Sequence, residues 1–254
     1  GLANHPALKA AAIKAVEKFG AGAGASRLIC GSLAPFHELE ESLAAFKGTE
    51  AALTFSTGYA AALGTITALA GKDDVIILDK LVHACIVDAA KLSGAKLRVF
   101  AHNDLNDLEE KLRWVAGFKS AIGNRQSATL IVTESIFSMH GDRAPLREIV
   151  ALKEKYGAWL MVDEAHATGI IGQNGRGLAD ELGVSNQIEI QMGGAPYGRR
   201  LSSVRSFRRR RPGSAPAGRL SGPRRRPAPG SPRPHRNGVQ QPSLGSLSRR
   251  LVRL

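Results

Sequence analysis

At 254 residues the chain is long enough for one large domain or two small ones, and its formal net charge is +13. Sixteen of its 35 basic residues are arginines in residues 195–254, and this segment contains no lysine, aspartate or glutamate. Residues 1–194 therefore contain 19 basic and 22 acidic residues, which gives a net charge of about −3. The basic pI therefore belongs to the last 60 residues alone, and the rest of the chain has the charge balance of an ordinary soluble enzyme.

Helical and strand patterns alternate along residues 1–194. In chain order they predict a helix at 6–18, a glycine-rich loop at 20–24, a helix at 35–46, a strand at 51–55, a helix at 58–69, a strand at 75–78, a helix at 81–92, a strand at 96–100, a helix capped by Asn103 or Asp104 and running to Leu112, a strand at 129–133, a helix at 146–156, and strands at 159–162 and 188–192. This alternation predicts an α/β fold, a mostly parallel sheet with helices on both faces.

The pattern changes after Gly194. Nine of the twelve prolines lie beyond it, together with four consecutive arginines at 208–211, and neither helical nor strand periodicity continues. Such a segment cannot bury enough apolar surface to offset the entropy lost on ordering. We therefore predict a folded domain over residues 1–194 and a disordered basic tail over residues 195–254.

The sequence predicts neither a metal site nor a membrane span. Cys30 and Cys85 give no disulfide framework and no zinc-ligand spacing, and the histidines lack a paired i, i+4 arrangement. Without a disulfide framework, a reducing cytoplasm is the expected compartment. No apolar run reaches 18 residues and no signal peptide is visible. Because the chain begins at Gly1 rather than at a methionine, we expect an upstream segment to be missing.

Polar residues follow three of the predicted strands. Asp163 directly follows the 159–162 run and His166 comes three residues later, while His83 follows 75–78 and Ser138 follows 129–133. In open α/β sheets, ligands bind just beyond the carboxyl ends of strands. These residues therefore point to a cofactor site, although each alone is also compatible with a helix cap, a structural histidine or a turn residue.

Two shorter patterns near these strand ends indicate two different functions, phosphate binding and helicase activity. Residues 55–59, Phe-Ser-Thr-Gly-Tyr, run from a strand through Gly58 into a helix, whose first N–H groups can bind a phosphate. Residues 163–166, Asp-Glu-Ala-His, spell a signature of certain helicases. A helicase also needs an upstream G-x-x-x-x-G-K-[ST] loop, and the sequence contains none, which disfavours a nucleic-acid motor.

Taken together, these segments resemble the α-oxoamine synthases, pyridoxal-phosphate enzymes of the fold-type-I aminotransferase superfamily. The resemblance runs from Gly1 to about Gly193. It rests on GAGAGASR at 20–27, FSTGY at 55–59, FSM at 137–139 with Gly-Asp at 141–142, VDEAH at 162–166, NGRG at 174–177 and QMG at 191–193. It implies the large, cofactor-binding domain of that fold.

The resemblance also implies a role for each site residue. Asp163 would pair with the pyridine nitrogen of pyridoxal phosphate (PLP) and keep it protonated, because a nearby anion favours the charged form. His166 would bond the phenolic oxygen of the ring and His83 would stack on the ring, which makes these three the expected catalytic residues. Gly58, Tyr59 and Ser138 would hold the phosphate or the ring edge.

Members of this family condense an acyl thioester with a small amino acid and release CO2, as homodimers. The sequence is most similar to a member that joins L-alanine to a pimeloyl thioester, carried by CoA or acyl carrier protein, in biotin synthesis. Residues 102–104, His-Asn-Asp, support this choice but also occur in 5-aminolevulinate synthase and serine palmitoyltransferase, and fit glycine C-acetyltransferase less well. These members remain alternatives.

The family pattern breaks after Gly193. Relatives continue with a threonine and, three residues on, the lysine that binds the cofactor covalently, whereas this chain has Gly194 and Tyr197 there and no lysine after Lys155. Arginine cannot replace that lysine, because it stays protonated. By comparison with the family, we also expect the small C-terminal domain to be missing. We therefore expect residues from about 194 onward to be out-of-frame translation and the chain to be inactive; the alternative is a genuine tail that binds nucleic acid by counterion release.

Overall fold

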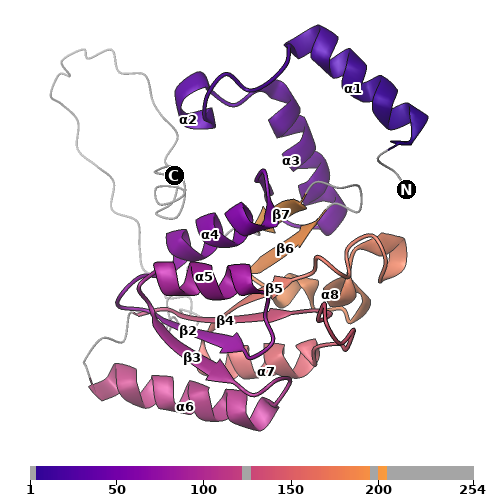
Figure 1. The fold of residues 1–254 in the computed structure, drawn as a ribbon. Coiled ribbons are helices and arrows are strands. Elements are labelled where there is room, and N and C mark those ends of the chain that lie inside the picture. The colour runs from indigo at the N-terminus through magenta and orange to yellow at the C-terminus, as the bar shows by residue number, and fades with distance from the viewer. Residues whose placement is uncertain (1–3, 122–126, 195–199, 205–254) are drawn as a thin grey trace, which may run out of the picture. The chain divides into compact units, whose positions relative to one another are not determined.

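The structure is a computed structural model that describes residues 4–121, 127–194 and 200–204. It contains one sheet whose strands follow the order β1-β7-β6-β5-β4-β2-β3 (Figure 1). The strands are β1 Leu53–Thr54, β2 Val75–Asp79, β3 Lys96–Phe100, β4 Thr129–Glu134, β5 Trp159–Asp163, β6 Ile190–Gly194 and β7 Arg200–Val204. Strands β2 to β6 are parallel and β7 is antiparallel to both its neighbours, which confirms the predicted mostly parallel sheet.

Helices cover both faces of this sheet, as predicted. Figure 1 shows α4 and α5 on one face and α6 and α7 on the other. The α-helices are α1 Pro6–Phe19, α2 Arg27–Cys30, α3 Ala34–Lys47, α4 Gly58–Leu69, α5 Ala84–Leu92, α6 Leu105–Ala121, α7 Leu146–Tyr156 and α8 Leu178–Glu181, and the short 3-10 turns are η2 Gln173–Gly175 and η3 Ser185–Gln187.

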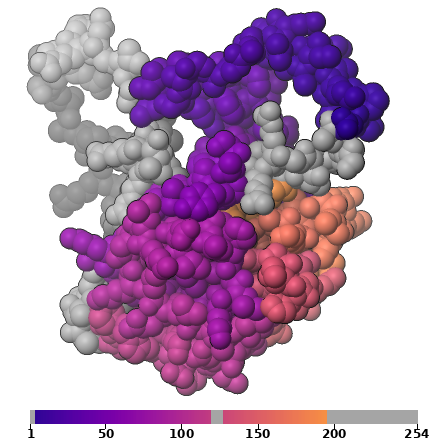
Figure 2. All heavy atoms as spheres, in the orientation of Figure 1, coloured from indigo at the N-terminus to yellow at the C-terminus, as the bar shows by residue number. Residues whose placement is uncertain are grey.

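The central strands are buried along their whole length because helices cover them on both sides. Every residue of β2 and β4 is buried, and so is every residue of β5 except its first, Trp159. Continuous apolar runs such as Val75-Ile76-Ile77-Leu78 are the expected sequence of such strands. In the space-filling view the purple-to-magenta segments and the orange ones form a continuous surface on the visible face (Figure 2).

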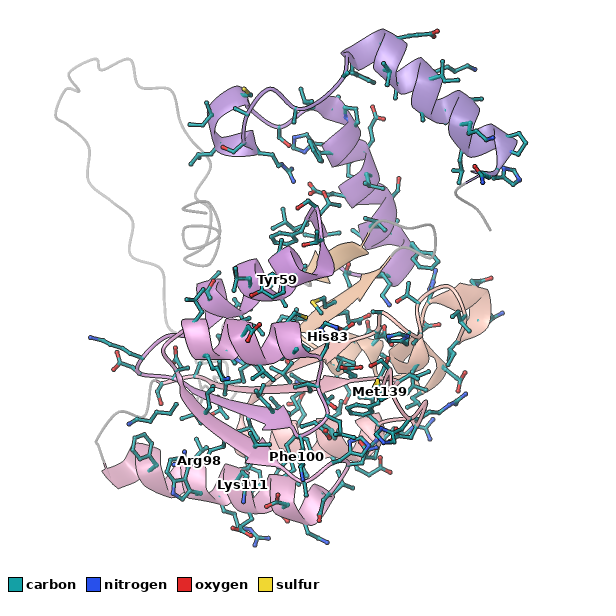
Figure 3. The ribbon with its side chains drawn as sticks, in the orientation of Figure 1. Tyr59, His83, Arg98, Phe100, Lys111 and Met139 are labelled. Carbon is teal, nitrogen blue, oxygen red and sulfur yellow. The ribbon has the colours of Figure 1, made fainter. Side chains whose placement is uncertain are left out.

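Helix α6 is longer than the sequence predicted, since it ends at Ala121 rather than Leu112. Its additional turns pack under the edge strand β3, where the Arg98 guanidinium lies 3.8 Å from the ring centroid of Trp114 and Lys96 Nζ lies 3.9 Å from that of Phe118. Figure 3 shows Arg98 on β3 directed toward α6. Cation–π contacts of this kind join residues from separate elements and leave no periodic sequence signal.

Strand β7 lies in the segment for which the sequence predicts disorder, and that prediction does not hold at these five residues. The backbone of β7 pairs with β6 on one side and with β1 on the other. Backbone hydrogen bonds of this kind do not require an apolar pattern, so they could not be predicted from the sequence. Residues 195–199 and 205–254 lie outside the described residues, and their disorder stays a prediction.

Candidate active site

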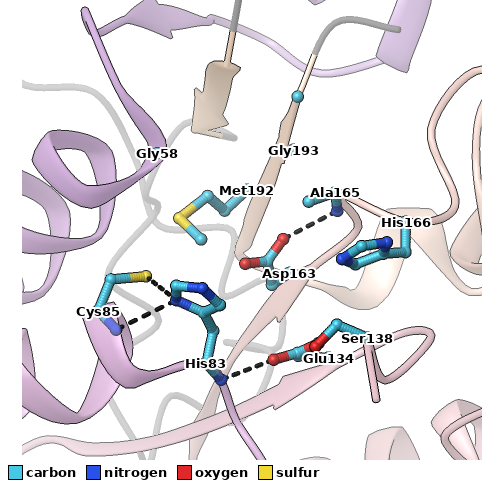
Figure 4. Close-up of a pocket in the computed structure, with 11 residues that line it drawn as sticks. Gly58, His83, Cys85, Glu134, Ser138, Asp163, Ala165, His166, Met192 and Gly193 are labelled. Carbon is cyan, nitrogen blue, oxygen red and sulfur yellow. Dashed lines mark hydrogen bonds between the residues drawn. The ribbon is translucent and has the colours of Figure 1, made fainter. Parts of the chain in front are cut away.

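A cavity lies where the strand order of the sheet reverses. The chain passes from β2 to β3 on one side, and β4 lies on the other side of β2, so the reversal falls between β2 and β4. In open α/β sheets, the crevice beyond the carboxyl ends of the strands at such a point is where ligands bind. The lining residues come from the ends of β4, β5 and β6, the loops after β2, β4 and β5, and the first turns of α4 and α5 (Figure 4): Gly58, His83, Cys85, Glu134, Ser138, Asp163, Ala165, His166, Met192, Gly193 and Gly194.

Five of the six residues predicted from the sequence line this cavity together: Gly58, His83, Ser138, Asp163 and His166. The sixth, Tyr59, is not among the lining residues. Its side chain is 49% exposed on α4, and its hydroxyl lies 3.5 Å from Oδ2 of Asp88 on α5 (Figure 3). The predicted contact of Tyr59 with a cofactor stays a prediction.

Asp163 is the last residue of β5 and places a buried carboxylate at the cavity. It lies in register with Glu134 of β4 and Met192 of β6, so three strand ends meet at this level of the sheet. Asp163 is 7% exposed, and its Oδ1 accepts a hydrogen bond from the Ala165 N–H at 2.8 Å. A carboxylate held in this way can accept a hydrogen bond from a protonated ring nitrogen, and the exposed imidazole of His166 lies beside it (Figure 4).

His83 is fixed at both its backbone and its ring. It is the N-cap of α5, where its Nδ1 accepts from the Cys85 N–H at 3.2 Å, so α5 begins at Ala84 rather than at the predicted residue 81. Its backbone N–H donates to Oε1 of Glu134 at 2.6 Å. The imidazole therefore has a defined place in the cavity wall, as a residue that stacks on a planar ligand requires.

Glu134 is a lining residue to which the sequence assigned no role. Burial raises the pKa of its carboxyl, although hydrogen bonds from the backbone N–H groups of His83 and Ser138 oppose this shift. It thus ties the loop after β2 to the loop after β4. A charged residue at the end of an otherwise apolar strand is the same signal that identified Asp163, and it could have identified Glu134; Cys85, Ala165 and Met192 carry no comparable signal.

The start of α4 reaches the cavity through Gly58. The Thr57 side chain caps this helix by accepting from the Ala60 N–H at 3.0 Å, and Gly58 reaches the cavity wall. The first N–H groups of a helix have no partner within it and bind anions readily. With Ser138 in the loop after β4, these groups suit the phosphate of a cofactor.

A second polar cluster lies at the end of β3, where the sequence has His102-Asn103-Asp104. His102 Nδ1 is 3.0 Å from Oδ1 of Asp79 and its Nε2 is 2.6 Å from Oδ2 of Asp142. Burial by itself lowers the pKa of His102, but the hydrogen bonds to the two carboxylates outweigh it, and the pKa is raised. Asn103, with φ of 55°, donates its backbone N–H to Asp79 and its side-chain amide to Asp142. The cluster joins the ends of β2 and β3 to the loop after β4.

The described residues fit the pyridine nitrogen and the phosphate of PLP, but none of them offers the lysine that would bind the cofactor covalently. The Asp163 carboxylate suits the pyridine nitrogen, and the start of α4 suits the phosphate. None of the lysines within the described ranges lines the cavity, and Lys47 Nζ is bound to Glu164 and to the carbonyl oxygen of Arg176. Tyr197, which stands at the expected lysine position, lies outside the described residues.

Two further properties of the described ranges bear on function. No three or more histidine, cysteine, aspartate or glutamate side chains come together there in a way that would hold a metal ion. No helix in the same part of the chain has the length and apolar character needed to cross a membrane.

Sequence comparison relates the chain to a known family. Residues 1–194 match the family described as aminotransferase class I and II. The chain is 50% identical over 207 residues to the 8-amino-7-oxononanoate synthase of Geotalea daltonii, covering 82% of this chain and 50% of that protein. It is 52% identical over 193 residues to the protein of the same name from Geobacter sulfurreducens, covering 76% and 47%. The chain spans about half the length of the curated relatives it matches.

Solved structures show the same likeness. The structure of serine palmitoyltransferase from S. paucimobilis with bound PLP-myriocin aldimine is 39% identical, with a TM-score of 0.73 and coverage of 82% of this chain and 51% of that one. The 8-amino-7-oxononanoate synthase from Francisella tularensis is 28% identical, with a TM-score of 0.65 and coverage of 81% and 55%. Both matches again span about half of the longer protein.

Proposed function

The chain belongs to the aminotransferase class I and II family, and from this premise we propose that residues 1–194 are the cofactor-binding part of an 8-amino-7-oxononanoate synthase, a PLP-dependent C-acyltransferase. The observation that carries the proposal is the cavity in which His83, Ser138, Asp163 and His166 come together at three strand ends. The identity of about half of the aligned residues to proteins of that name supports the choice within the family.

Each side chain has a defined task in this proposal. Asp163 accepts the hydrogen bond of the pyridine N–H and holds the proton on that nitrogen, because a buried anion beside it favours the charged form. When bound, PLP supplies an electron sink for the pair left at Cα of an amino acid. His166 donates to the phenolic oxygen of the ring, and His83 lies against the ring and shields that face from water.

The proposed substrates are L-alanine and a pimeloyl thioester carried by CoA or acyl carrier protein, with release of CO2 and the thiol. The proposed assembly is a cytoplasmic homodimer. Apolar side chains that are more than half exposed on α1 and α2 support a second copy as the covering partner: Ile13, Val16, Leu28 and Ile29. Large exposed apolar areas of this kind are typical of interaction surfaces.

We propose that the chain in its present sequence binds PLP without a covalent bond and does not turn over. A Schiff-base lysine must be neutral at working pH to attack the cofactor aldehyde, and no lysine follows Lys155. Sequencing the gene across codons 190–200 tests the out-of-frame origin of the tail. An intact reading frame through this junction in independent clones contradicts that origin.

PLP binding tests the proposed site directly. The purified chain is incubated with PLP, treated with borohydride and dialysed, and its mass is measured; we expect no covalent adduct, but saturable binding that quenches intrinsic fluorescence. Asp163→Asn is expected to weaken this binding about tenfold to a hundredfold, since a charge-assisted hydrogen bond contributes roughly 1.5–3 kcal/mol. Asp180→Asn, on α8 outside the cavity lining, is the matched control. Equal affinity of the wild type and Asp163→Asn contradicts the proposed site.

A second candidate is another member of the same enzyme group, one that uses serine. It is favoured by the higher identity and TM-score of the serine palmitoyltransferase structure than of the Francisella synthase. The two are distinguished with the enzyme expressed from a restored reading frame, by CO2 release from L-alanine with pimeloyl-CoA against L-serine with palmitoyl-CoA.

A further inference from the structure

Cys85 makes two contacts with a single nitrogen of His83. Its backbone N–H donates to Nδ1 at 3.2 Å, and its Sγ lies 3.0 Å from the same Nδ1 (Figure 4). Cys85 is 4% exposed and lines the cavity. The sequence analysis assigns no role to this cysteine, and the proposed function does not use it.

These contacts fix where the proton of the neutral imidazole lies. A backbone N–H can only donate, so the nitrogen that accepts from it carries no proton. Nδ1 of His83 is therefore the bare nitrogen, and a neutral ring then carries its proton on Nε2. A thiol is a weak donor, so Cys85 adds a second donor directed at the same bare nitrogen.

The opposite assignment conflicts with the backbone. A thiolate at Cys85 paired with an imidazolium at His83 would require a proton on Nδ1. That proton would point at the backbone N–H of Cys85. The nitrogen of this N–H lies 3.2 Å from Nδ1, and its hydrogen bond to Nδ1 caps α5. Two donors facing each other would break the cap and leave the N–H without its acceptor.

We propose that Cys85 is a positioning residue for His83. Its thiol and its backbone N–H together hold Nδ1 as an acceptor and thereby present Nε2–H to the cavity. Glu134 fixes the backbone of His83, because its Oε1 accepts the His83 N–H at 2.6 Å. The imidazole ring can then still rotate about its side-chain bonds, and the contacts with Cys85 restrict this rotation. The proposal rests on the proposed function only in taking this cavity to be the cofactor site.

The tautomer of His83 can be measured in the full 254-residue chain without cofactor. Long-range 1H–15N correlation spectra distinguish a bare ring nitrogen from a protonated one, and His83→Asn identifies the signals. We expect the wild type to show Nδ1 bare and Nε2 protonated. Cys85→Ala removes the thiol and keeps the backbone N–H, so the ratio of the Nε2–H to the Nδ1–H form is expected to fall about twofold to fivefold, the size of one weak hydrogen bond.

Cys85→Ser is the rescue variant, because its hydroxyl donates in the same place, and it is expected to restore the wild-type ratio. An Nδ1–H signal for His83 in the wild type overturns the proposal. So does an unchanged ratio in Cys85→Ala, or an equal loss in the alanine and serine variants, which would indicate packing alone. The signals of His102, bound to Asp79 and Asp142, report in the same spectra that each variant is folded.

The result is independent of PLP binding. If no variant binds PLP, the proposed function fails while the spectra still decide the role of Cys85. If the spectra overturn the role of Cys85, the effect of Asp163→Asn on PLP binding is unaffected.

Discussion

Lys47, the last residue of α3, and Glu164, the residue that follows β5, form a buried ion pair. The distance between Nζ and Oε2 is 2.5 Å, and the two side chains are 6% and 0% exposed. Lys47 also donates to the carbonyl oxygen of Arg176 at 2.6 Å, and Oε1 of Glu164 accepts from the Ala179 N–H at 2.9 Å. The pair therefore joins α3 and α8 to the loop after Asp163.

Removing one partner of this pair is expected to be strongly destabilising. Lys47→Met leaves the Glu164 carboxylate buried without its cation, which lowers the free energy of unfolding by about 3–5 kcal/mol. Urea denaturation followed by circular dichroism measures the change. The double variant Lys47→Met/Glu164→Gln no longer buries an unpaired charge and should recover part of the loss.

The control for this experiment is Lys14→Met on α1, where the side chain is exposed. Its free energy of unfolding should stay within about 0.5 kcal/mol of the wild type. A double variant that is as unstable as Lys47→Met alone would show that packing of the lysine, rather than the buried charge, is what matters.

Gly177 is expected to tolerate no side chain. Its φ is 110°, and a Cβ there would lie 2.6 Å from both carboxylate oxygens of Glu164. Gly177→Ala therefore combines backbone strain with a clash against a buried charge, and should cost about 2–4 kcal/mol by urea denaturation. Gly117→Ala in α6 is the matched control, because a Cβ there would have no side chain or other segment of the chain within 4 Å, and it should stabilise by about 0.5–1 kcal/mol. Similar effects of the two substitutions contradict this account.

His102 should make stability depend on pH above 6.5. Its pKa in the folded chain is raised above 6.5 by the carboxylates of Asp79 and Asp142, which outweigh burial. The folded state then holds the proton more tightly than the unfolded state, so the stabilisation is complete below pH 6.5 and is lost as the pH rises through the raised pKa. His102→Gln should flatten the decline of unfolding free energy in this window. His37→Gln, an exposed residue of α3, should leave it unchanged.

Glu134 should make stability depend on pH in a range that begins at a lower pH, 4.5. Burial raises its pKa above 4.5, so the folded state again binds the proton more tightly, and stability falls as the pH rises from 4.5 through the raised pKa. Glu134→Gln cannot titrate and should remove this decline, as followed by urea denaturation at a series of pH values. Glu41→Gln, exposed on α3, is the control. A decline that persists in Glu134→Gln would assign it to another group.

The sequence by itself determined the α/β fold and predicted five of the eleven residues that line the cavity. Buried strands covered on both faces require continuous apolar runs, and the residues just after such runs must lie at the carboxyl edge of the sheet. That is why Asp163, His83 and Ser138 could be identified without coordinates. The sequence alone also shows that no lysine follows Lys155.

Only the tertiary structure decided which of these residues touch. Glu134 faces the cavity because β4 and β5 pair with Glu134 opposite Asp163, a register that neither strand encodes alone. Cys85 reaches Nδ1 of His83 because α5 starts at Ala84, and the Tyr59 hydroxyl lies 3.5 Å from Oδ2 of Asp88. Periodicity tells which face of an element is buried, but contacts between elements depend on register, helix start and side-chain direction, which are set when the layers pack.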